Sequence, residues 1–295
     1  MCKLDSGEFC ESVGELAGGT TSGGETASGR EAALDEPIAL QLSRLTTDFY
    51  AENADSFSET RATAWAGWER LLEEVAPAMQ SQNPRVLDLA CGNMRFARFL
   101  ADRLPQCSIE YLAADNCSGL AGANNADVSV KIGNRFTGSF QQLDIISSLA
   151  ASNLAVDLAV CDKSCDLAVA FGFMHHIPLA AWRREFLQAL AAKVRPGGYV
   201  AVSFWRFMSS PKLAKKAQAT TAQACAELSL PELPENDYLL GWQQTRGSYR
   251  YCHHFDEAEI ASFEQALGPR ATLVARYQAD GKPGNLNEYS IWQVC

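Results

Sequence analysis

Three features that mark other classes of protein are missing from this chain of 295 residues. Its longest uncharged apolar run, residues 167–174, has about eight residues, whereas a membrane-spanning helix needs about 20. Its 10 cysteines include no C-x-x-C pair, so neither a zinc ribbon nor a disulfide framework is indicated. The chain does not open with a basic stretch followed by an apolar run, so a secretory signal is not expected. We expect a cytoplasmic protein with reduced thiols, without a membrane partner or a metal site.

Aromatic residues are scarce in residues 1–36, where glycine, serine, threonine and glutamate dominate. Such a composition buries too little apolar surface to offset the conformational entropy lost on folding, so we predict a disordered acidic tail. Residues 1–60 contain 12 acidic and 3 basic residues and so carry −9 of the formal net charge of −10. Since the remainder is close to neutral, composition neither excludes nor supports a nucleic-acid partner.

From residue 37 onward the pattern is that of a folded domain. Apolar residues at helical spacing predict two helices, 38–54 and 62–79, which form a helical lid spanning 37–84. Short aliphatic runs then alternate with amphipathic segments, except at 147–164, which we treat as an insertion. The predicted strands are 85–89, 109–113, 140–143, 167–171, 199–205, 271–279 and 289–294, and the predicted helices include 94–103 and 179–194. This alternation favours an α/β, doubly wound, mostly parallel sheet with helices on both faces and ligands at the carboxyl ends of the strands.

The predicted strand 85–89 runs into a turn that suits one kind of nucleotide cofactor better than another. Asp88 and Gly92 lie in the sequence Val-Leu-Asp-Leu-Ala-Cys-Gly-Asn, where a dinucleotide fold would have G-x-G-x-x-G to receive a pyrophosphate. An acidic residue before the turn would repel a pyrophosphate. S-adenosylmethionine (SAM) has no phosphate and carries a sulfonium and an ammonium group, so Asp88 and Gly92 favour SAM.

Two further acidic residues follow the next two predicted strands. Asp115 comes after strand 109–113, where a carboxylate can accept hydrogen bonds from both ribose hydroxyls. Asp144 comes after strand 140–143, where it can accept from the amino group of adenine, with Ile145 beside the ring. Each acid could instead cap the helix that follows it, and the sequence leaves that alternative open.

At these residues the chain resembles the class I SAM-dependent methyltransferases. The matching motifs are 88–92, Asp115, Asp144, 166–176 and 193–198, so the resemblance covers roughly residues 85–294. It implies a seven-stranded sheet and a cofactor site formed by Asp88, Ala90, Gly92, Asp115, Asp144 and Ile145. The family's first motif usually has glycine where this chain has Ala90 and Met94. We expect Met94 to place a bulky side chain beside the path of the cofactor.

Within that superfamily the chain is most similar to the tRNA methyltransferases that esterify 5-carboxymethyluridine at the wobble position. Three segments carry the likeness: 49–68, the Phe-Met-His-His-Ile-Pro segment 173–178, and 241–255 with its Arg-Tyr-Cys-His-His-Phe run. The likeness implies a tRNA anticodon stem-loop as partner and a substrate-recognition insertion at about 206–255 within a methyltransferase domain spanning 85–295. The sequence leaves open whether a small activating subunit is required.

The resemblance also implies roles for individual residues. Arg61 is expected to pair with the substrate carboxylate, and His175 or His176 to hydrogen-bond that carboxylate or the uracil edge, so these three are the expected catalytic residues. Aromatic faces for an extruded base and polar groups around it complete the expected substrate site, which consists of Trp65, Trp242, Arg250, Tyr251 and His253.

Two other functions stay open at this point. The first is a methyltransferase for a small carboxylate or phenol, in which a histidine would act as general base for the phenol. The second is a non-catalytic scaffold subunit that keeps the fold with a cofactor loop weakened by Met94. The fold alone does not choose among these functions.

Overall fold

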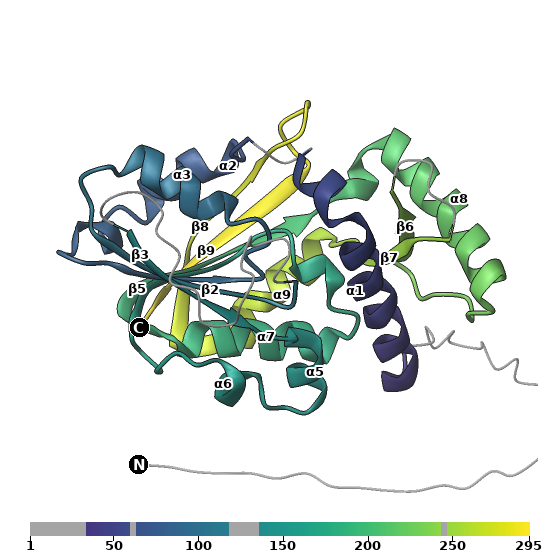
Figure 1. Ribbon diagram of the computed structural model, residues 1–295, viewed down its shortest axis with the longest axis horizontal. Helices are drawn as coiled ribbons and strands as arrows, with labels where there is room; N and C mark the ends of the chain where they lie inside the picture. The colour runs from purple at the N-terminus through teal and green to yellow at the C-terminus, as the bar shows by residue number, and fades with distance from the viewer. Residues whose placement is uncertain (1–33, 60–62, 118–135, 243–246) are drawn as a thin grey trace, which may run out of the picture. The chain divides into compact units, whose positions relative to one another are not determined.

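The computed structural model describes residues 34–59, 63–117, 136–242 and 247–295. These residues form a seven-stranded sheet in the order β3-β2-β1-β4-β5-β9-β8 (Figure 1). Strands β1 to β5 run parallel, whereas β9 runs antiparallel to both β5 and β8. The strands are β1 Arg85–Leu89, β2 Ile109–Asp115, β3 Phe136–Gln142, β4 Cys165–Ala170, β5 Val194–Trp205, β8 Ala271–Ala279 and β9 Asn287–Val294. The predicted α/β, doubly wound, mostly parallel seven-stranded sheet is confirmed.

Helices cover both faces of this sheet (Figure 1). They are α1 Glu36–Glu59, α2 Gly67–Glu74, α3 Arg95–Arg103, α5 Ile145–Ala150, α6 Leu154–Asp157, α7 Ala180–Ala192, α8 Pro211–Leu228 and α9 Glu257–Leu267, with short 3-10 helices η1 Ala78–Gln80, η2 Met174–His176, η3 Phe207–Ser209 and η4 Gly268–Arg270. No helix in the described ranges combines the length and apolarity that a membrane span requires.

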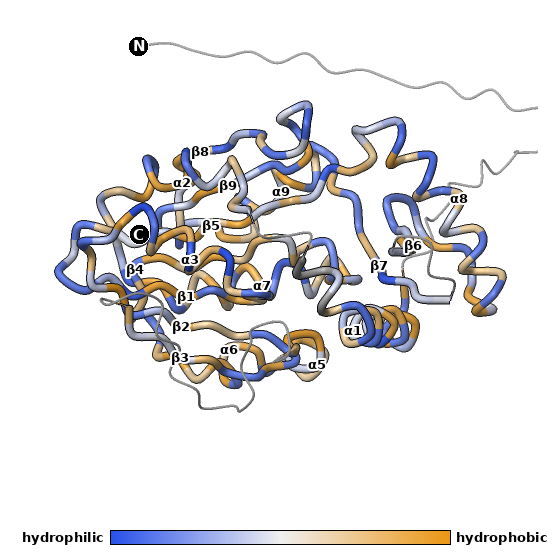
Figure 2. Tube along the Cα trace, turned by 45° about the horizontal axis from the view of Figure 1, so that its top comes forward, coloured by the Kyte–Doolittle hydropathy of each residue, from blue (hydrophilic) through white to orange (hydrophobic). Residues whose placement is uncertain are grey.

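Two apolar clusters hold the layers together. On one face, α2 and α3 pack on the sheet through Trp68 and Phe96. On the other face, α7 and α9 pack through Phe186 and Phe263. Strand β4 lies between the two clusters and is buried along its whole length, as expected for a central parallel strand. Figure 2 shows hydrophobic residues concentrated along the central strands of the sheet.

The boundaries differ from the sequence-based prediction mainly in the helical regions. The predicted helix 62–79 is shorter, because the chain forms α2 over Gly67–Glu74 and only a 3-10 turn, η1, after Pro77. The segment 147–164, treated as an insertion, contains the end of α5 and the single turn α6. Strand β3 begins at Phe136, four residues before the predicted strand 140–143, and pairs with β2 along its whole length.

A second sheet of two strands was not predicted. Strands β6 (Asp237–Gly241) and β7 (Tyr249–His253) pair antiparallel within the segment 206–255, after helix α8. Leu42 of α1, Ala224 of α8 and Tyr251 of β7 share one buried cluster, which fixes this small sheet against α1. The consequence is that α1 lies between the small sheet and the carboxyl ends of the parallel strands, as Figure 1 shows.

Candidate functional site

A pocket opens at the carboxyl ends of the parallel strands. All six residues expected to bind the cofactor line it, namely Asp88, Ala90, Gly92, Asp115, Asp144 and Ile145. It is also lined by four residues expected on the catalytic or substrate side, which are Trp65, His175, His176 and Arg250. Polar residues of α1 and the turn between β8 and β9 form further walls. One pocket therefore joins most of the residues that the sequence motifs singled out.

The turn after β1 is held open by backbone geometry. Gly92 has φ +52°, and no atom lies within 4 Å of the position that a Cβ would take. The N–H of Gly92 donates to Asp115 Oδ2 at 2.9 Å, and the N–H of Cys117 donates to Asp115 Oδ1 at 2.9 Å. Asp115 thus ties the turn after β1 to the end of β2, while its carboxylate has lone pairs left to accept from a ligand.

Met94 does not take the position that the sequence suggested. Its backbone adopts the left-handed conformation, with φ +59°, which is the reason why glycine is usual there. That conformation turns the side chain into the apolar cluster of Trp68 and Phe96, where it is 3% exposed, and Met94 does not line the pocket. The expectation that Met94 narrows the path of the cofactor is therefore wrong. Ala90, at φ +62°, is the second residue in this conformation within the turn.

Asp88 is a buried acid with an unusual affinity for its proton. Tyr111 donates to its Oδ2 at 2.5 Å. Burial, opposed by this hydrogen bond and reinforced by the neighbouring Asp115, raises the pKa of Asp88 to about 7. Burial likewise raises the pKa of Asp115, although three backbone N–H groups oppose the shift. A positively charged or hydrogen-bond-donating ligand would therefore stabilise the ionised form of both carboxylates.

Asp144 has the capping role that the sequence left open. It precedes α5, and its Oδ1 accepts from the N–H of Ser147 at 3.1 Å while its Oδ2 accepts from the Ser147 hydroxyl at 2.7 Å. The same residue lines the pocket beside Ile145. Capping and ligand contact are therefore compatible here, because each oxygen retains one lone pair.

The two histidines of η2 are buried in the pocket wall. The Nδ1 of His176 lies 2.7 Å from the carbonyl oxygen of Tyr251, and its Nε2 lies 2.9 Å from the hydroxyl of Tyr50. Because a carbonyl only accepts, Nδ1 carries a proton and donates to Tyr251; in the neutral ring Nε2 is then the acceptor for the hydroxyl of Tyr50. His175 packs on the rings of His176 and Trp205. Within the described residues, His175, His176 and Cys252 also bring potential metal ligands within 4.8 Å, but Nδ1 of His176 is already engaged.

Strand β7 divides the predicted substrate residues between its two faces. Arg250 lines the pocket and is 5% exposed, with its guanidinium carbon 4.8 Å from the ring centroid of Phe49. Tyr251 and His253 do not line the pocket. Tyr251 reaches the other way, toward Asp237, as does His253. Successive side chains of a strand point to opposite faces, so Arg250 cannot share a face with either residue.

Of the two predicted tryptophans, only Trp65 lines the pocket, and Arg61 is not among the described residues. Trp65 lines the pocket, where it packs on Trp68 and against Gly172. Trp242 does not line the pocket; its Nε1 donates to Ser56, and its ring lies 5.8 Å from the guanidinium of Arg250. Arg61 lies outside the described residues, so its predicted pairing with a carboxylate stays a prediction. Residues 1–33 also lie outside the described residues, so the predicted disorder of the tail 1–36 stays a prediction.

Among the lining residues that were not predicted as site residues are Arg95, Asp280 and Tyr50. Arg95 follows the turn at the start of α3, and its guanidinium carbon lies 4.9 Å from the ring centroid of Trp65 and 5.4 Å from that of Trp68. Burial lowers the pKa of Arg95 to about 10. Asp280, in the turn after β8, accepts from Tyr289 at 2.5 Å. Tyr50 contacts His176 from α1. Arg95 could have been found from sequence as the first helical residue after the cofactor turn, and Tyr50 lies in the segment 49–68 that carries the resemblance. Asp280 gave no such signal, because it comes from an element far along the chain.

Comparisons with known proteins agree with this geometry. A family model described as a methyltransferase domain matches residues 57–270. A curated protein of Encephalitozoon cuniculi (strain GB-M1), which carries a provisional methyltransferase name, is 25% identical over 220 residues, covering 75% of this chain and 84% of that protein.

Solved structures show the same fold. A SAM-dependent methyltransferase from Methanosarcina mazei matches with a TM-score of 0.53 and 18% identity, over 75% of this chain and 96% of that one. A SAM-dependent methyltransferase from Clostridium acetobutylicum matches with a TM-score of 0.50 and 10% identity, over 83% and 98% of the two chains.

Proposed function

Because this chain belongs to the methyltransferase domain family, as a SAM-dependent methyltransferase, we propose that it methylates the carboxylate of a carboxymethyl-modified wobble uridine in tRNA. The observation that carries the proposal is Arg250, a buried guanidinium in the wall of the pocket, with its carbon 5.9 Å from the ring centroid of Trp205. An arginine is always charged and presents a planar fork of donors that matches a carboxylate.

The residues of the pocket fit SAM. Asp115 offers carboxylate lone pairs to a ribose, Asp144 and Ile145 lie beside each other for an adenine, and Gly92 leaves open space next to the backbone. Asp88 supplies a buried acid for the positively charged amino-acid end of the cofactor. When bound, SAM supplies an activated methyl group on a sulfonium. The chain's own task is then to hold the acceptor in line and to exclude water.

The hydrogen bonds of His176 suit an acceptor that is already an ionised carboxylate. An ionised carboxylate needs no general base at neutral pH, and His176 is held in one tautomer by a carbonyl on one side and a hydroxyl on the other. Its Nδ1 proton is committed to Tyr251, so the ring serves as a fixed wall beside Arg250. A phenol acceptor would instead have to lose a proton to a nearby base.

Exposed lysines near the pocket and an aromatic residue inside it support a nucleic-acid substrate. Lys212, Lys215 and Lys216 are exposed on α8, which packs on β6, the pairing partner of the strand that carries Arg250. Such a basic helix next to the pocket wall suits contact with phosphates. Trp65 offers an aromatic face in the pocket for an extruded base. Arg206, by contrast, is paired with Glu288 and is not free to bind phosphate.

A small carboxylate is the second candidate substrate, because Arg250 recognises a carboxylate whatever group carries it. The two candidates differ in whether the α8 lysines matter. The scaffold alternative loses its main support, since Met94 packs in the core and leaves the cofactor pocket open.

Nucleoside mass spectrometry of tRNA tests the proposal under conditions that preserve any activating subunit. A strain lacking this gene should lose the methyl ester of carboxymethyluridine and accumulate the free acid. An Arg250→Lys allele should restore little of the ester, because it keeps the charge and loses the fork. An Arg206→Lys allele is the matched control and should restore it fully.

The same samples separate the two substrates. An unchanged ester in the deletion strain overturns the tRNA proposal. If labelled methyl from SAM then appears on a small carboxylate in an extract and depends on Arg250, the metabolite methyltransferase takes its place. The Lys212, Lys215 and Lys216 triple substitution to Gln should lower tRNA methylation and leave methylation of a small carboxylate unchanged.

A further inference from the structure

We propose that the buried side chains of Arg183, His253 and Asp237, together with the partly buried Glu259, form a positioning network that holds His176 and Arg250 in place only while His253 is protonated. None of the four lines the pocket. The network joins α7, α9, β7 and β6, so it connects elements that meet only in the folded chain. Its effect on turnover rests on the proposed function, whereas its effect on His176 does not.

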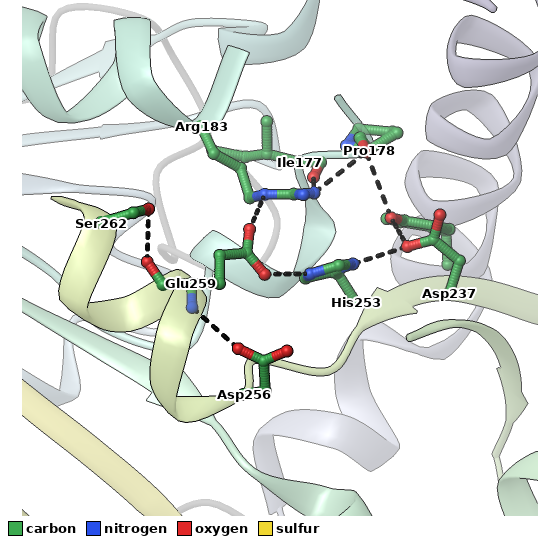
Figure 3. A network of polar contacts seen from close by, with 9 residues as sticks. Ile177, Pro178, Arg183, Asp237, His253, Asp256, Glu259 and Ser262 are labelled. Atoms are coloured by element: carbon green, nitrogen blue, oxygen red, sulfur yellow. Dashed lines mark hydrogen bonds and ion pairs between the residues drawn. The ribbon is translucent and has the colours of Figure 1, made fainter. Parts of the chain in front are cut away.

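The network is a continuous chain of short polar contacts (Figure 3). Arg183 Nε lies 2.9 Å from Glu259 Oε1, and Glu259 Oε2 lies 2.6 Å from His253 Nε2. On the other side of the ring, His253 Nδ1 lies 2.6 Å from Asp237 Oδ1. Both ring nitrogens therefore face carboxylates, and an imidazole can donate to both only when it is protonated.

Each end of the network reaches the pocket wall. Arg183 Nη1 donates to the carbonyl oxygens of Ile177 at 2.9 Å and Pro178 at 3.0 Å, the two residues that follow His176. At the other end, Asp237 accepts from the hydroxyl of Tyr251 at 2.5 Å. The carbonyl of Tyr251 is the acceptor for His176 Nδ1. His176 is thus held through the loop after it and through the strand opposite it.

Strand β7 extends the effect to Arg250. His253, Tyr251 and Arg250 lie within four residues of one strand, with His253 anchored to Asp237 of β6 on one side and Glu259 of α9 on the other. A shift of this anchor moves the backbone that presents Arg250 to the pocket. The network therefore acts through His176 and Arg250, and its members are positioning residues.

The charges facing His253 explain why its proton matters. Asp237 from β6 and Glu259 from α9 attract the imidazolium, while Arg183 from α7 repels it; Tyr251 on the same strand donates to Asp237. Burial opposes the charged ring, but the two carboxylate contacts outweigh burial and raise the pKa of His253. With His253 protonated the two cations and two anions balance. Loss of that proton leaves a buried network with one excess negative charge and one carboxylate facing a lone pair.

The sign of the pH dependence follows from these shifts. A raised pKa of His253 means that the network contributes fully below the ordinary histidine range and is lost as pH rises through the higher folded value. The contacts of Glu259 with His253 and Arg183 lower the pKa of that carboxyl, so its contribution is lost only in acid. The network is therefore complete below the ordinary histidine range and breaks as pH rises through the raised pKa of His253.

Nuclear magnetic resonance of the full chain with ¹⁵N-labelled histidine tests the positioning role without any substrate. The chain has four histidines, so single His→Gln variants assign the signals. In the wild type we expect a protected Nδ1–H signal from His176 that weakens as His253 titrates. In His253→Gln, which has one donor group and cannot be charged, the His176 signal should be weak at every pH.

Arg183→Lys gives a second test, since it keeps the charge but loses contacts to the two carbonyls and Glu259. Lys193→Gln is the matched control, because Lys193 is also a buried basic residue at the end of α7 and pairs with Asp162 at 2.8 Å. Arg183→Lys should weaken the His176 signal. Lys193→Gln should lower the melting temperature and leave the His176 signal unchanged.

Kinetics with a carboxymethyluridine anticodon stem-loop completes the experiment. At a pH where His253 of the wild type is protonated, His253→Gln should lower kcat about tenfold while KM for SAM stays within about twofold. The kcat of the variant should also lack the fall that the wild type shows as His253 loses its proton. A His176 signal that is indifferent to His253 protonation and to Arg183→Lys overturns the inference. A wild type that leaves the stem-loop unmethylated in an extract that retains any activating subunit overturns the proposed function alone, since the resonance measurements need no substrate.

Discussion

The two halves of the pocket are built in different ways. The cofactor half, Asp88, Gly92, Asp115 and Asp144, comes from the ends of β1, β2 and β3 and is held by bonds between neighbouring strands. The substrate half, His176, Arg250 and Tyr50, comes from η2, β7 and α1. The contact between Tyr50 and His176 joins residues 126 apart in the chain.

The two halves should therefore respond differently to substitution. The cofactor half is part of the main sheet, so its residues act directly on a ligand and variants should change SAM affinity. The substrate half depends on a small sheet, a helix and a buried ionic network, so variants there should change turnover and active-site geometry more than SAM binding.

The largest effect expected in the cofactor half is the pH dependence of SAM binding. Because the pKa of Asp88 is raised to about 7 and the ionised form attracts the cationic cofactor, the dissociation constant should rise about tenfold for each pH unit below about 7. Isothermal calorimetry between pH 5 and pH 8 measures this slope. Asp88→Asn should bind more weakly at pH 8 and show a smaller slope, since burial also raises the pKa of Asp115. An equal slope in that variant would assign the pH effect to another group.

The raised pKa of Asp88 also determines how the free energy of unfolding changes with pH. Between about 4 and about 7, the folded chain holds the Asp88 proton that the unfolded chain has lost. The free energy of unfolding contributed by Asp88 therefore falls as pH rises through this range. Urea unfolding of the wild type and Asp88→Asn at several pH values checks it, and the advantage of the wild type over the variant should shrink as pH rises.

Met94→Ala should destabilise the fold by about 2–5 kcal/mol, the range for removing a buried methionine side chain. The substitution leaves the left-handed backbone strain in place, because alanine keeps its Cβ. SAM affinity should stay close to that of the wild type, since Met94 does not line the pocket. Unfolding and calorimetry measured on one preparation separate the two quantities. A gain in SAM affinity would return Met94 to the path of the cofactor.

Asp115→Ala should weaken SAM binding by about 1.5–3 kcal/mol, which is roughly tenfold to a hundredfold in the dissociation constant. The carboxylate is lost both to the cofactor and to the N–H groups of Gly92 and Cys117. Asp115→Asn retains one oxygen and should fall between the variant and the wild type. An unchanged dissociation constant in Asp115→Ala would remove Asp115 from the cofactor site.

Asp144→Ala should cost about 1 kcal/mol of stability, the usual value of a helix N-cap. Its effect on SAM binding should be smaller than that of Asp115→Ala, because both oxygens of Asp144 already accept from Ser147. Ser147→Ala, which removes only the hydroxyl contact, is the control for the cap. If Asp144→Ala lost as much SAM affinity as Asp115→Ala, the hydrogen bonds by which Asp144 caps α5 would not weaken its contact with the cofactor.

The cofactor half could be predicted from the sequence because its signals are local. An acid at the end of an apolar strand and a glycine in the next turn specify their own neighbourhood, and parallel strands bring such ends together. Asp88, Asp115 and Asp144 therefore reached the same pocket. Met94 was misplaced because the sign of its φ, which directs the side chain, cannot be read from the residue type alone.

The substrate half was predicted less well for a physical reason. Strand β7 was not recognised, so Arg250, Tyr251 and His253 were placed together, although alternation sends neighbours to opposite faces. The pairing of β7 with β6 and its packing on α1 depend on contacts between residues far apart. Tyr251, for example, donates its N–H to Thr46, 205 residues away. No local pattern specifies such a contact.

Ala90→Gly is the smallest change and tests whether the cofactor turn still carries strain. At φ +62°, alanine costs roughly 1–2 kcal/mol relative to a residue without a Cβ, whereas glycine adds about 0.4–1 kcal/mol of unfolded-state entropy. The net gain should be about 0.5 kcal/mol, or a rise of about 1–2 °C in melting temperature. Ala114→Gly, in the extended strand β2 that accepts the N–H of Ala90, should instead destabilise the chain. If both variants lose stability, the surrounding turn has already relaxed around alanine. Ala90 then causes no backbone strain in the cofactor half of the pocket.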